Sequence, residues 1–241
     1  MSFVIYFCAH LIATISVQPL ANKALPLPDH TLWNIELHKY CTAEGRVDFK
    51  AWAAHPEVLH DYLDAITPSA PLPHWSRNVQ LSYWLNVYNA SVVSMIIDQY
   101  PLKSIQDLHE GHPLEFVWIK IGSQTYSLKQ LEEEVIRKQF HEPEVVFALY
   151  RAAQSSPPLF YEAFDPARLD IQLQSIVRRF VNDHRYNQTS TDPLLVSQLF
   201  EWYRSDFKPD IPTFLRKYAE PPMDTTVTNV QFNSFDWKLD D

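Results

Sequence analysis

The chain has 241 residues, enough for one large domain with a buried core, and its 46% hydrophobic and 20% charged residues are typical of a globular protein. The formal net charge is −9, and this acidic balance argues against the concentrated basic face with which proteins bind nucleic acid. Only three glycines are present and no two are near each other, which excludes a P-loop, a dinucleotide fingerprint and a nucleophile elbow. The sequence also lacks CxxC and HExxH patterns, so we expect no metal site and no other cofactor.

The chain begins with an apolar run over residues 3–17, which a proline-rich polar segment follows over residues 18–30. The run is shorter than the roughly 20 residues that a transmembrane helix needs, but it fits the apolar region of an export signal. No Lys or Arg precedes it and no clean cleavage motif follows it, so a buried N-terminal strand or helix is the alternative. We expect residues 1–24 to be a signal peptide and proline-rich leader. The mature protein would then be periplasmic or secreted, with no transmembrane segment.

Helical patterns dominate the first half of the remaining chain. Apolar residues recur at helical spacing over residues 33–40 and 56–66. The most apolar stretch, residues 82–100, predicts a central helix that Pro101 ends.

A hairpin is predicted next, because residues 116–121 alternate in polarity and Gly122 with Ser123 forms a turn. Ser127 and Gln130 then have the spacing of a capping box, which predicts the start of a helix that extends to residue 140.

The second half predicts helices over residues 166–182, 193–207 and 211–218; a proline lies near the first turn of the first two. The tail, residues 227–241, is compatible with a closing strand. We therefore expect an α+β fold that is mainly α-helical, with a small antiparallel sheet, in a single globular domain over residues 31–241.

Two asparagines stand out in the central helix, in the stretch WLNVYNA at residues 84–90. Asn86 and Asn89 are three residues apart and therefore share one face of the helix. Burying an unpaired amide is costly, so something must bind these two groups. They either tie the helix to irregular backbone nearby or form the polar floor of a pocket, and both roles are possible together.

Charged residues follow on the helix after the hairpin. The run Glu132–Glu134 is typical of a solvated face, and Glu133 with Arg137 has the i, i+4 spacing of an ion pair. Glu132, however, is in register with apolar neighbours, so its carboxylate can turn inward. No partner for acid–base chemistry is visible at a fixed spacing from it.

Ser155 and Ser156 precede two prolines. A nucleophilic serine needs a general base within hydrogen-bond reach, and the sequence identifies none, so a rigid loop is the better interpretation. The histidines, including His109 and His112, are scattered and form no recognisable ligand set.

Four stretches of the sequence contain these residues, and taken together they resemble the family catalogued as domain of unknown function 547. They are LSYWLNVYNASVVSMIIDQYPLKSI, WIKIGSQTYSLKQLEEEVIR, VVFALYRAAQSSPPL and LDIQLQSIVRRFVND, and with flanking pieces the resemblance spans residues 33–240. The W-x-N-x-Y-N pattern of that family is matched by Trp84, Asn86, Tyr88 and Asn89. Its Glu and Arg after the hairpin are matched by Glu132 and Arg137.

The chain departs from the family pattern at four positions. Glu133 and Val146 stand where the family usually has His, and Arg151 and Ser156 stand where it usually has Cys. Thiolates and imidazoles are the groups most easily turned into nucleophiles, bases or metal ligands near neutral pH. The resemblance therefore implies a degenerate member that has lost either a Cys/His-dependent chemistry or a structural thiol pair, and both possibilities weaken the case for an enzyme.

We therefore expect an exported, non-catalytic domain that binds an unidentified small molecule or protein partner in a polar pocket around Asn86 and Asn89. The alternative is a hydrolase or transferase that uses Ser156 or Glu132 in the same cleft. The candidate site residues are Trp84, Asn86, Tyr88, Asn89, Glu132, Arg137 and Ser156.

Overall fold

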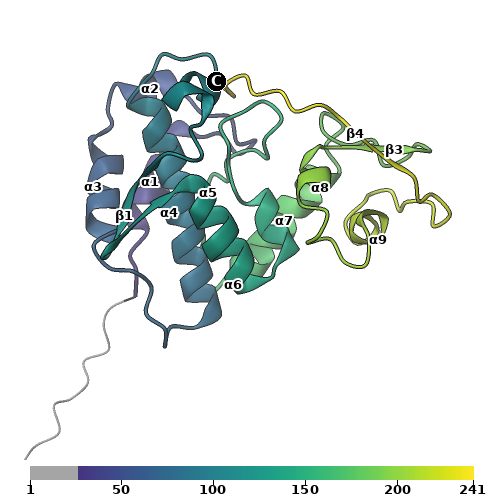
Figure 1. Cartoon of the computed structure of the whole chain (residues 1–241), viewed down its shortest axis with the longest axis horizontal. Coiled ribbons are helices and arrows are strands. Elements are labelled where there is room, and N and C mark those ends of the chain that lie inside the picture. Colours follow the sequence, from purple (N-terminus) through teal and green to yellow (C-terminus); the bar gives the residue numbers. More distant parts are fainter. Residues whose placement is uncertain (1–26) are drawn as a thin grey trace, which may run out of the picture.

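A computed structural model describes residues 27–241, so the predicted leader lies outside the described residues. The fold is mainly helical α+β, as the sequence predicts (Figure 1). The longer helices are α1 (Thr31–Tyr40), α3 (Glu57–Ile66), α4 (Arg77–Ile97) and α7 (Leu169–Val181). The shorter ones are α2 (Phe49–Ala53), α5 (Leu128–Gln130), α6 (Lys138–Phe140), α8 (Leu199–Trp202) and α9 (Ile211–Arg216). The strands are β1 (Val117–Ile121), β2 (Gln124–Ser127), β3 (Leu194–Val196) and β4 (Val230–Phe232).

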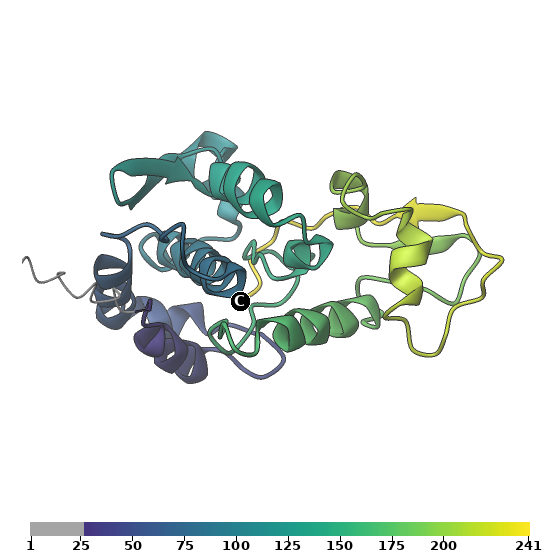
Figure 2. The ribbon, with the colours of Figure 1, turned by 90° about the horizontal axis from the view of Figure 1, so that it is seen from below.

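Helix α4 lies at the centre of the fold, among α1, α2, α3 and the helical segment that follows the hairpin (Figures 1 and 2). From Leu81 onward every residue of α4 is buried, which is expected of a helix that is apolar on all sides. The helix begins five residues before its predicted start, because the Ser76 side chain caps it by accepting from the Val79 N–H. Among the described residues, none of the helices has both the length and the apolar character needed to cross a bilayer.

The predicted hairpin is confirmed: β1 and β2 pair antiparallel, and Gly122 occupies the turn with φ +58°. The capping box is confirmed as well. The Gln130 N–H donates to Ser127 Oγ at 3.1 Å, and the Ser127 N–H donates to Gln130 Oε1 at 2.9 Å. The helix that starts here changes from α-helical to π-helical geometry over residues 131–137 before it ends at Phe140. The sequence gives no sign of this change of register.

The segment that runs from β3 through α8 and α9 to β4 extends to one side of the helical bundle (Figure 2). The prediction of a helix over residues 193–207 is wrong, because this stretch forms strand β3 and the short helix α8. Strand β3 pairs parallel with β4, which lies in the tail. A short apolar run does not distinguish a strand from a helix by itself, and here a partner strand more than thirty residues away supplies the backbone hydrogen bonds.

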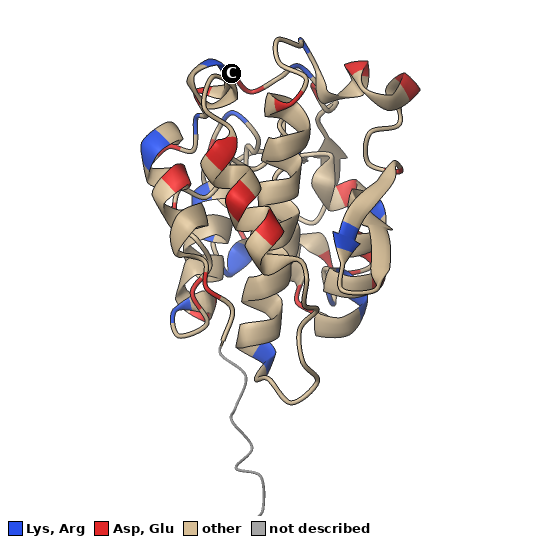
Figure 3. Cartoon of the chain, turned by 90° about the vertical axis from the view of Figure 1, so that its left-hand side faces the viewer, with Lys and Arg blue, Asp and Glu red and all other residues tan. Residues whose placement is uncertain are grey.

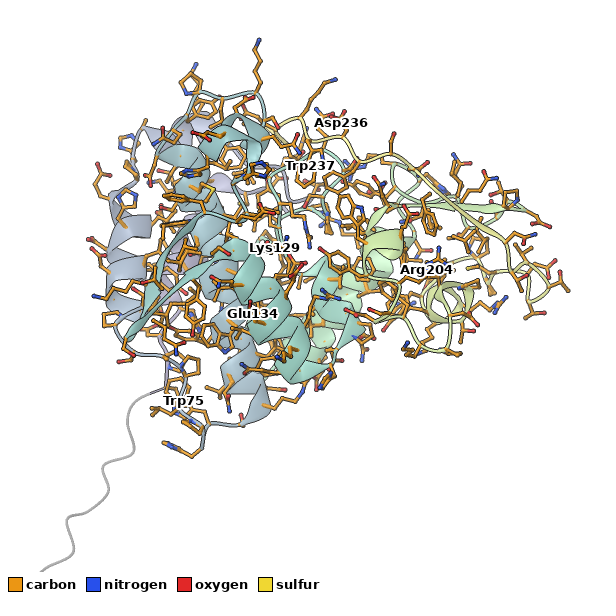
Figure 4. The ribbon with its side chains drawn as sticks, in the orientation of Figure 1. Trp75, Lys129, Glu134, Arg204, Asp236 and Trp237 are labelled. Atoms are coloured by element: carbon orange, nitrogen blue, oxygen red, sulfur yellow. The ribbon has the colours of Figure 1, made fainter. Side chains whose placement is uncertain are left out.

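The tail after β4 is held to two distant segments, so it closes the fold as the sequence suggests. The Asp236 N–H donates to Ser155 Oγ at 2.9 Å, and the Ser104 hydroxyl donates to the Trp237 carbonyl at 2.7 Å. The Gln154 N–H donates to the Lys238 carbonyl at 2.8 Å. Asp236 and Trp237 lie in this tail, along the upper edge of the molecule in Figure 4.

His30, just before α1, makes the stability of the fold sensitive to acid. Its Nδ1 lies 2.8 Å from the Tyr62 hydroxyl on α3, and burial lowers the pKa of His30 to about 4. The unfolded chain, with a His pKa of about 6.5, binds the proton first, so this stabilisation is complete above pH 6.5 and is lost as the pH falls toward 4. We expect a loss of about 2–3 kcal/mol in the free energy of unfolding between pH 7 and pH 4.5.

Urea unfolding of the wild type and of His30→Gln at these two pH values measures this contribution. The variant should lose less stability than the wild type, because the other titrating groups are common to both proteins. An equal loss in the two proteins would show that His30 is not the group responsible.

Candidate functional site

The amides of Asn86 and Asn89 tie helix α4 to two distant stretches of backbone. Asn86 Nδ2 donates to the Phe164 carbonyl at 2.9 Å, and its Oδ1 accepts from the Phe164 N–H at 2.8 Å. Asn89 Nδ2 donates to the Ala148 carbonyl at 2.9 Å, and its Oδ1 accepts from the Tyr150 N–H at 2.9 Å. Both polar atoms of each amide are thus used inside the protein. Of the two roles that the sequence allows, this geometry matches the structural one.

Arg151 forms a buried ion pair with Glu132. The Arg151 side chain is 1% exposed and that of Glu132 6%, and Arg151 Nη2 donates to Glu132 Oε1 at 3.0 Å. The guanidinium also donates to the Tyr203 hydroxyl at 2.8 Å and to the Leu149 carbonyl at 2.9 Å. Glu132 thus turns inward, as its register with apolar neighbours suggests. Glu133 and Glu134 are exposed instead, and Glu134 lies on the side of the helix that faces the viewer in Figure 4.

Ser156 is fully buried and joins this cluster by a hydrogen bond to the backbone N–H of Arg151. Its Oγ accepts from the Arg151 N–H at 2.9 Å and donates to the Pro157 carbonyl at 2.9 Å. Between them Ala152 has φ +50°, a left-handed conformation that is uncommon for a residue with a side chain. The Ser156 hydroxyl therefore holds a tight loop together, and its proton is already donated to a carbonyl. A serine bound in this way is poorly placed to act as a nucleophile.

Arg137 pairs with Asp206, so the predicted ion pair with Glu133 is wrong. Arg137 Nε and Nη2 donate to the two carboxylate oxygens of Asp206 at 2.7 and 2.9 Å. The expected pair depended on the i, i+4 spacing of an α-helix, and residues 131–137 are π-helical with i→i+5 bonding. The Arg137 guanidinium also lies 4.5 Å from the centre of the Tyr203 ring. Tyr203 thus contacts both arginines of the cluster.

The Arg151 guanidinium stays charged and the two nearby phenols stay neutral near pH 7. Burial alone would lower the pKa of the Arg151 guanidinium, but Glu132 and the two neighbouring tyrosines raise it above its ordinary value. Burial raises the pKa of Tyr203, which the charge of Arg151 only partly opposes, and burial also raises the pKa of Tyr88. Neither phenol can then ionise near pH 7. These groups stabilise an ion pair and are not poised to transfer protons in catalysis.

The structure brings part of the predicted site together. Tyr88, Asn89, Glu132, Arg137 and Ser156 all lie on or beside the elements that surround Arg151. The predicted Trp84 lies elsewhere, packed edge-on against Tyr83 and Tyr126, and Asn86 binds the Phe164 backbone.

Three residues that bind the candidate site residues or each other are not identified as partners from the sequence, namely Arg151, Tyr203 and Asp206. An arginine in the apolar stretch before the serine loop is the one signal in the sequence that points to a buried charge. Nothing in the local sequence around Tyr203 or Asp206 indicates their role.

The four positions that depart from the family pattern do not behave as one group. Arg151 and Ser156 contact each other, Val146 is fully buried in the core, and Glu133 is exposed to solvent. The chain thus places a charged side chain and a hydroxyl where the family usually has cysteines, and both take part in the buried cluster.

Comparisons with known proteins add one finding about the segment that contains these residues. Neither the curated proteins nor the solved structures contain a match to this chain. Residues 72–181 match the family model described as "Protein of unknown function, DUF547". The matched segment runs from just before α4 to the end of α7, and includes Asn86, Asn89, Glu132, Arg151 and Ser156. Over residues 72–181 the chain is thus similar to the DUF547 family of proteins of unknown function.

Proposed function

We propose that this protein is a non-catalytic binding domain whose rigid framework is built around helix α4. The observation that carries the proposal is the closed cluster of Glu132, Arg151 and Tyr203, in which the charges are paired and the hydrogen bonds are made within the protein. Buried groups satisfied in this way stabilise one conformation and are not free to attack a substrate. Asn86 and Asn89 serve the same framework, and the ligand would bind near it.

Mass spectrometry of small molecules that co-purify with the native protein tests this proposal. After denaturation of the protein, we expect one molecule to be released in near-stoichiometric amount. That molecule should rebind to fresh protein and be recovered unchanged after prolonged incubation.

The same experiment separates binding from the alternative activity as a hydrolase or transferase. Conversion of the molecule into a product, with the conversion abolished by Ser156→Ala or Glu132→Gln, would contradict the non-catalytic proposal. Recovery of the unchanged molecule with wild type and with Ser156→Ala alike would support it.

We further propose that the protein is exported and acts in the periplasm or outside the cell. The support is the apolar run over residues 3–17 and the proline-rich segment behind it. N-terminal sequencing of the protein from its native host should find a mature terminus between residues 17 and 25. An intact terminus at Met1 or Ser2 would contradict export by cleavage of this leader.

A further inference from the structure

A hollow of about 400 Å³ lies between helix α3, helix α4 and strand β1, a volume in the range of small-molecule sites. These elements form the side of the molecule that faces the viewer in Figure 3. Helix α4 contributes Ser91 and Ser94. Ser91 follows Asn86 by five residues, which is about 140° around a helix of 3.6 residues per turn. The hollow therefore lies against a different face of α4 from the face on which Asn86 and Asn89 bind the backbone of other segments.

Two polar atoms at the hollow have no hydrogen-bond partner among the described residues. They are the Ser91 hydroxyl and the indole N–H of Trp118 on β1, and both atoms are buried. Such atoms are uncommon because they lose their bonds to water on folding and gain nothing in return. Neither atom is exposed in the structure, so to meet a ligand the Trp118 ring must tilt its N–H, and the Ser91 side chain must rotate its hydroxyl, toward the hollow. A bound acceptor is the partner that would offset the cost of burying this donor.

A polar network links α4 to α3 beside the hollow. The Ser94 hydroxyl donates to Asp98 Oδ2 at 3.0 Å, and Asp98 Oδ1 lies 2.9 Å from His60 Nε2. Asp98 thus orients the imidazole of His60, a lining residue, and leaves its Nδ1 without a described partner. An oriented imidazole nitrogen can donate or accept according to its tautomer.

Charges of both signs lie at the rim. Asp64 belongs to the acidic outer face of α3, where three acidic residues and no Lys or Arg are exposed (Figure 3). Lys120 on β1 supplies a positive charge at the same hollow. A ligand with one net charge would be attracted by one of these groups and repelled by the other.

We infer that this hollow binds a small, uncharged, polyhydroxylated molecule of about monosaccharide size. Hydroxyl groups both donate and accept, so one such ligand can meet the Trp118 N–H, the Ser91 hydroxyl and the Asp64 carboxylate at once. The Trp118 ring and the neighbouring Leu63 offer an apolar surface to the C–H groups of the ligand. The inference rests on the proposed binding function and assigns its site to this hollow.

Titration of the full chain with glucose, galactose and myo-inositol, followed by two-dimensional NMR, tests the inference, with glycine and glutamate as zwitterionic and charged comparisons. We expect saturable binding of at least one polyol. Trp118→Phe keeps an aromatic ring at this position but is smaller than the indole and lacks the N–H donor, and it should weaken binding about fivefold to tenfold. Ser91→Ala should weaken binding by a similar factor.

Ser82→Ala is a matched control, because Ser82 is also a buried serine of α4 whose hydroxyl has no described partner, but it does not line the hollow. Its polyol affinity should equal that of the wild type. Thermal unfolding of Ser91→Ala and Ser82→Ala without ligand should give melting temperatures at or above that of the wild type, because each change removes an unpaired polar atom and a weak helix former. Trp118→Phe should unfold at a lower temperature, because the smaller phenyl ring loses packing contacts.

Polyol binding that Trp118→Phe and Ser91→Ala leave unchanged would overturn the assignment of the site, although the protein would still be a binding domain. Binding of glycine or glutamate with the same sensitivity to these variants would overturn the ligand class. Absence of binding by every probe would overturn the inference, whereas the fate of the co-purifying molecule tests the proposed function separately.

Discussion

Replacing Arg151 with methionine is expected to lower the free energy of unfolding by about 3–5 kcal/mol. The change leaves the Glu132 carboxylate buried without its ion-pair partner, and it also removes the donors to Tyr203 and to the Leu149 carbonyl. Breaking one half of a buried pair costs far more than the pair contributes as a whole, because the remaining charge cannot return to water. Urea unfolding at pH 7 gives the difference directly.

The double change Glu132→Leu with Arg151→Met distinguishes this explanation from a simple loss of packing. Removing both charges should recover most of the lost stability, because no uncompensated charge is left. Arg168→Met is the surface control: Arg168 pairs with Glu162 at 3.0 Å, but its side chain is 55% exposed, so its loss should cost less than about 1 kcal/mol. A double variant less stable than Arg151→Met alone would contradict the proposed origin of the effect.

Asn86→Ala and Asn89→Ala are each expected to destabilise the protein by about 1–3 kcal/mol. Each change leaves one buried backbone N–H and one buried carbonyl without a partner, at Phe164 for the first variant and at Tyr150 and Ala148 for the second. Alanine is the better helix former, so helix propensity acts in the opposite direction but by less than about 1 kcal/mol. The net effect should therefore be a clear decrease in the urea midpoint.

Asn78→Ala provides the comparison within the same helix. Asn78 lies in the first turn of α4 and is only half-buried. Its side chain donates to the Pro166 carbonyl at 3.4 Å and accepts from the exposed Arg77 guanidinium at 3.1 Å. Its loss should cost less than the loss of either buried amide. Unchanged midpoints in Asn86→Ala and Asn89→Ala would mean that these amides are not needed to hold the backbone of residues 148–150 and 164.

Arg151 also illustrates how a family scaffold can accommodate a change of chemistry. The sequence resemblance suggests that cysteine is usual at this position, and an arginine there introduces a large buried cation. Such a charge is tolerated only with a buried counter-charge and filled hydrogen bonds, which Glu132, Tyr203 and Leu149 supply. The retained framework and the fixed charges together support binding over catalysis as the proposed function.

The sequence by itself determined the features that depend on neighbours a few residues away. The central helix, the hairpin turn at Gly122 and the capping box of Ser127 with Gln130 follow from hydrophobic periodicity and from local hydrogen bonds. The inward direction of Glu132 follows from the same periodicity. These interactions form within one or two turns of chain, so their residue types and spacings are sufficient to predict them.

Only the tertiary structure decided which groups those side chains bind. Glu132 meets Arg151, 19 residues away, Arg137 meets Asp206 at a separation of 69, and Asn86 binds Phe164 at a separation of 78. Strand β3 likewise depends on β4 in the distant tail, where local pattern alone favoured a helix. Every polar group here has many possible partners in the sequence. The choice among them is made by which backbone segments pack against α4, because burial makes an unpaired group too costly to remain.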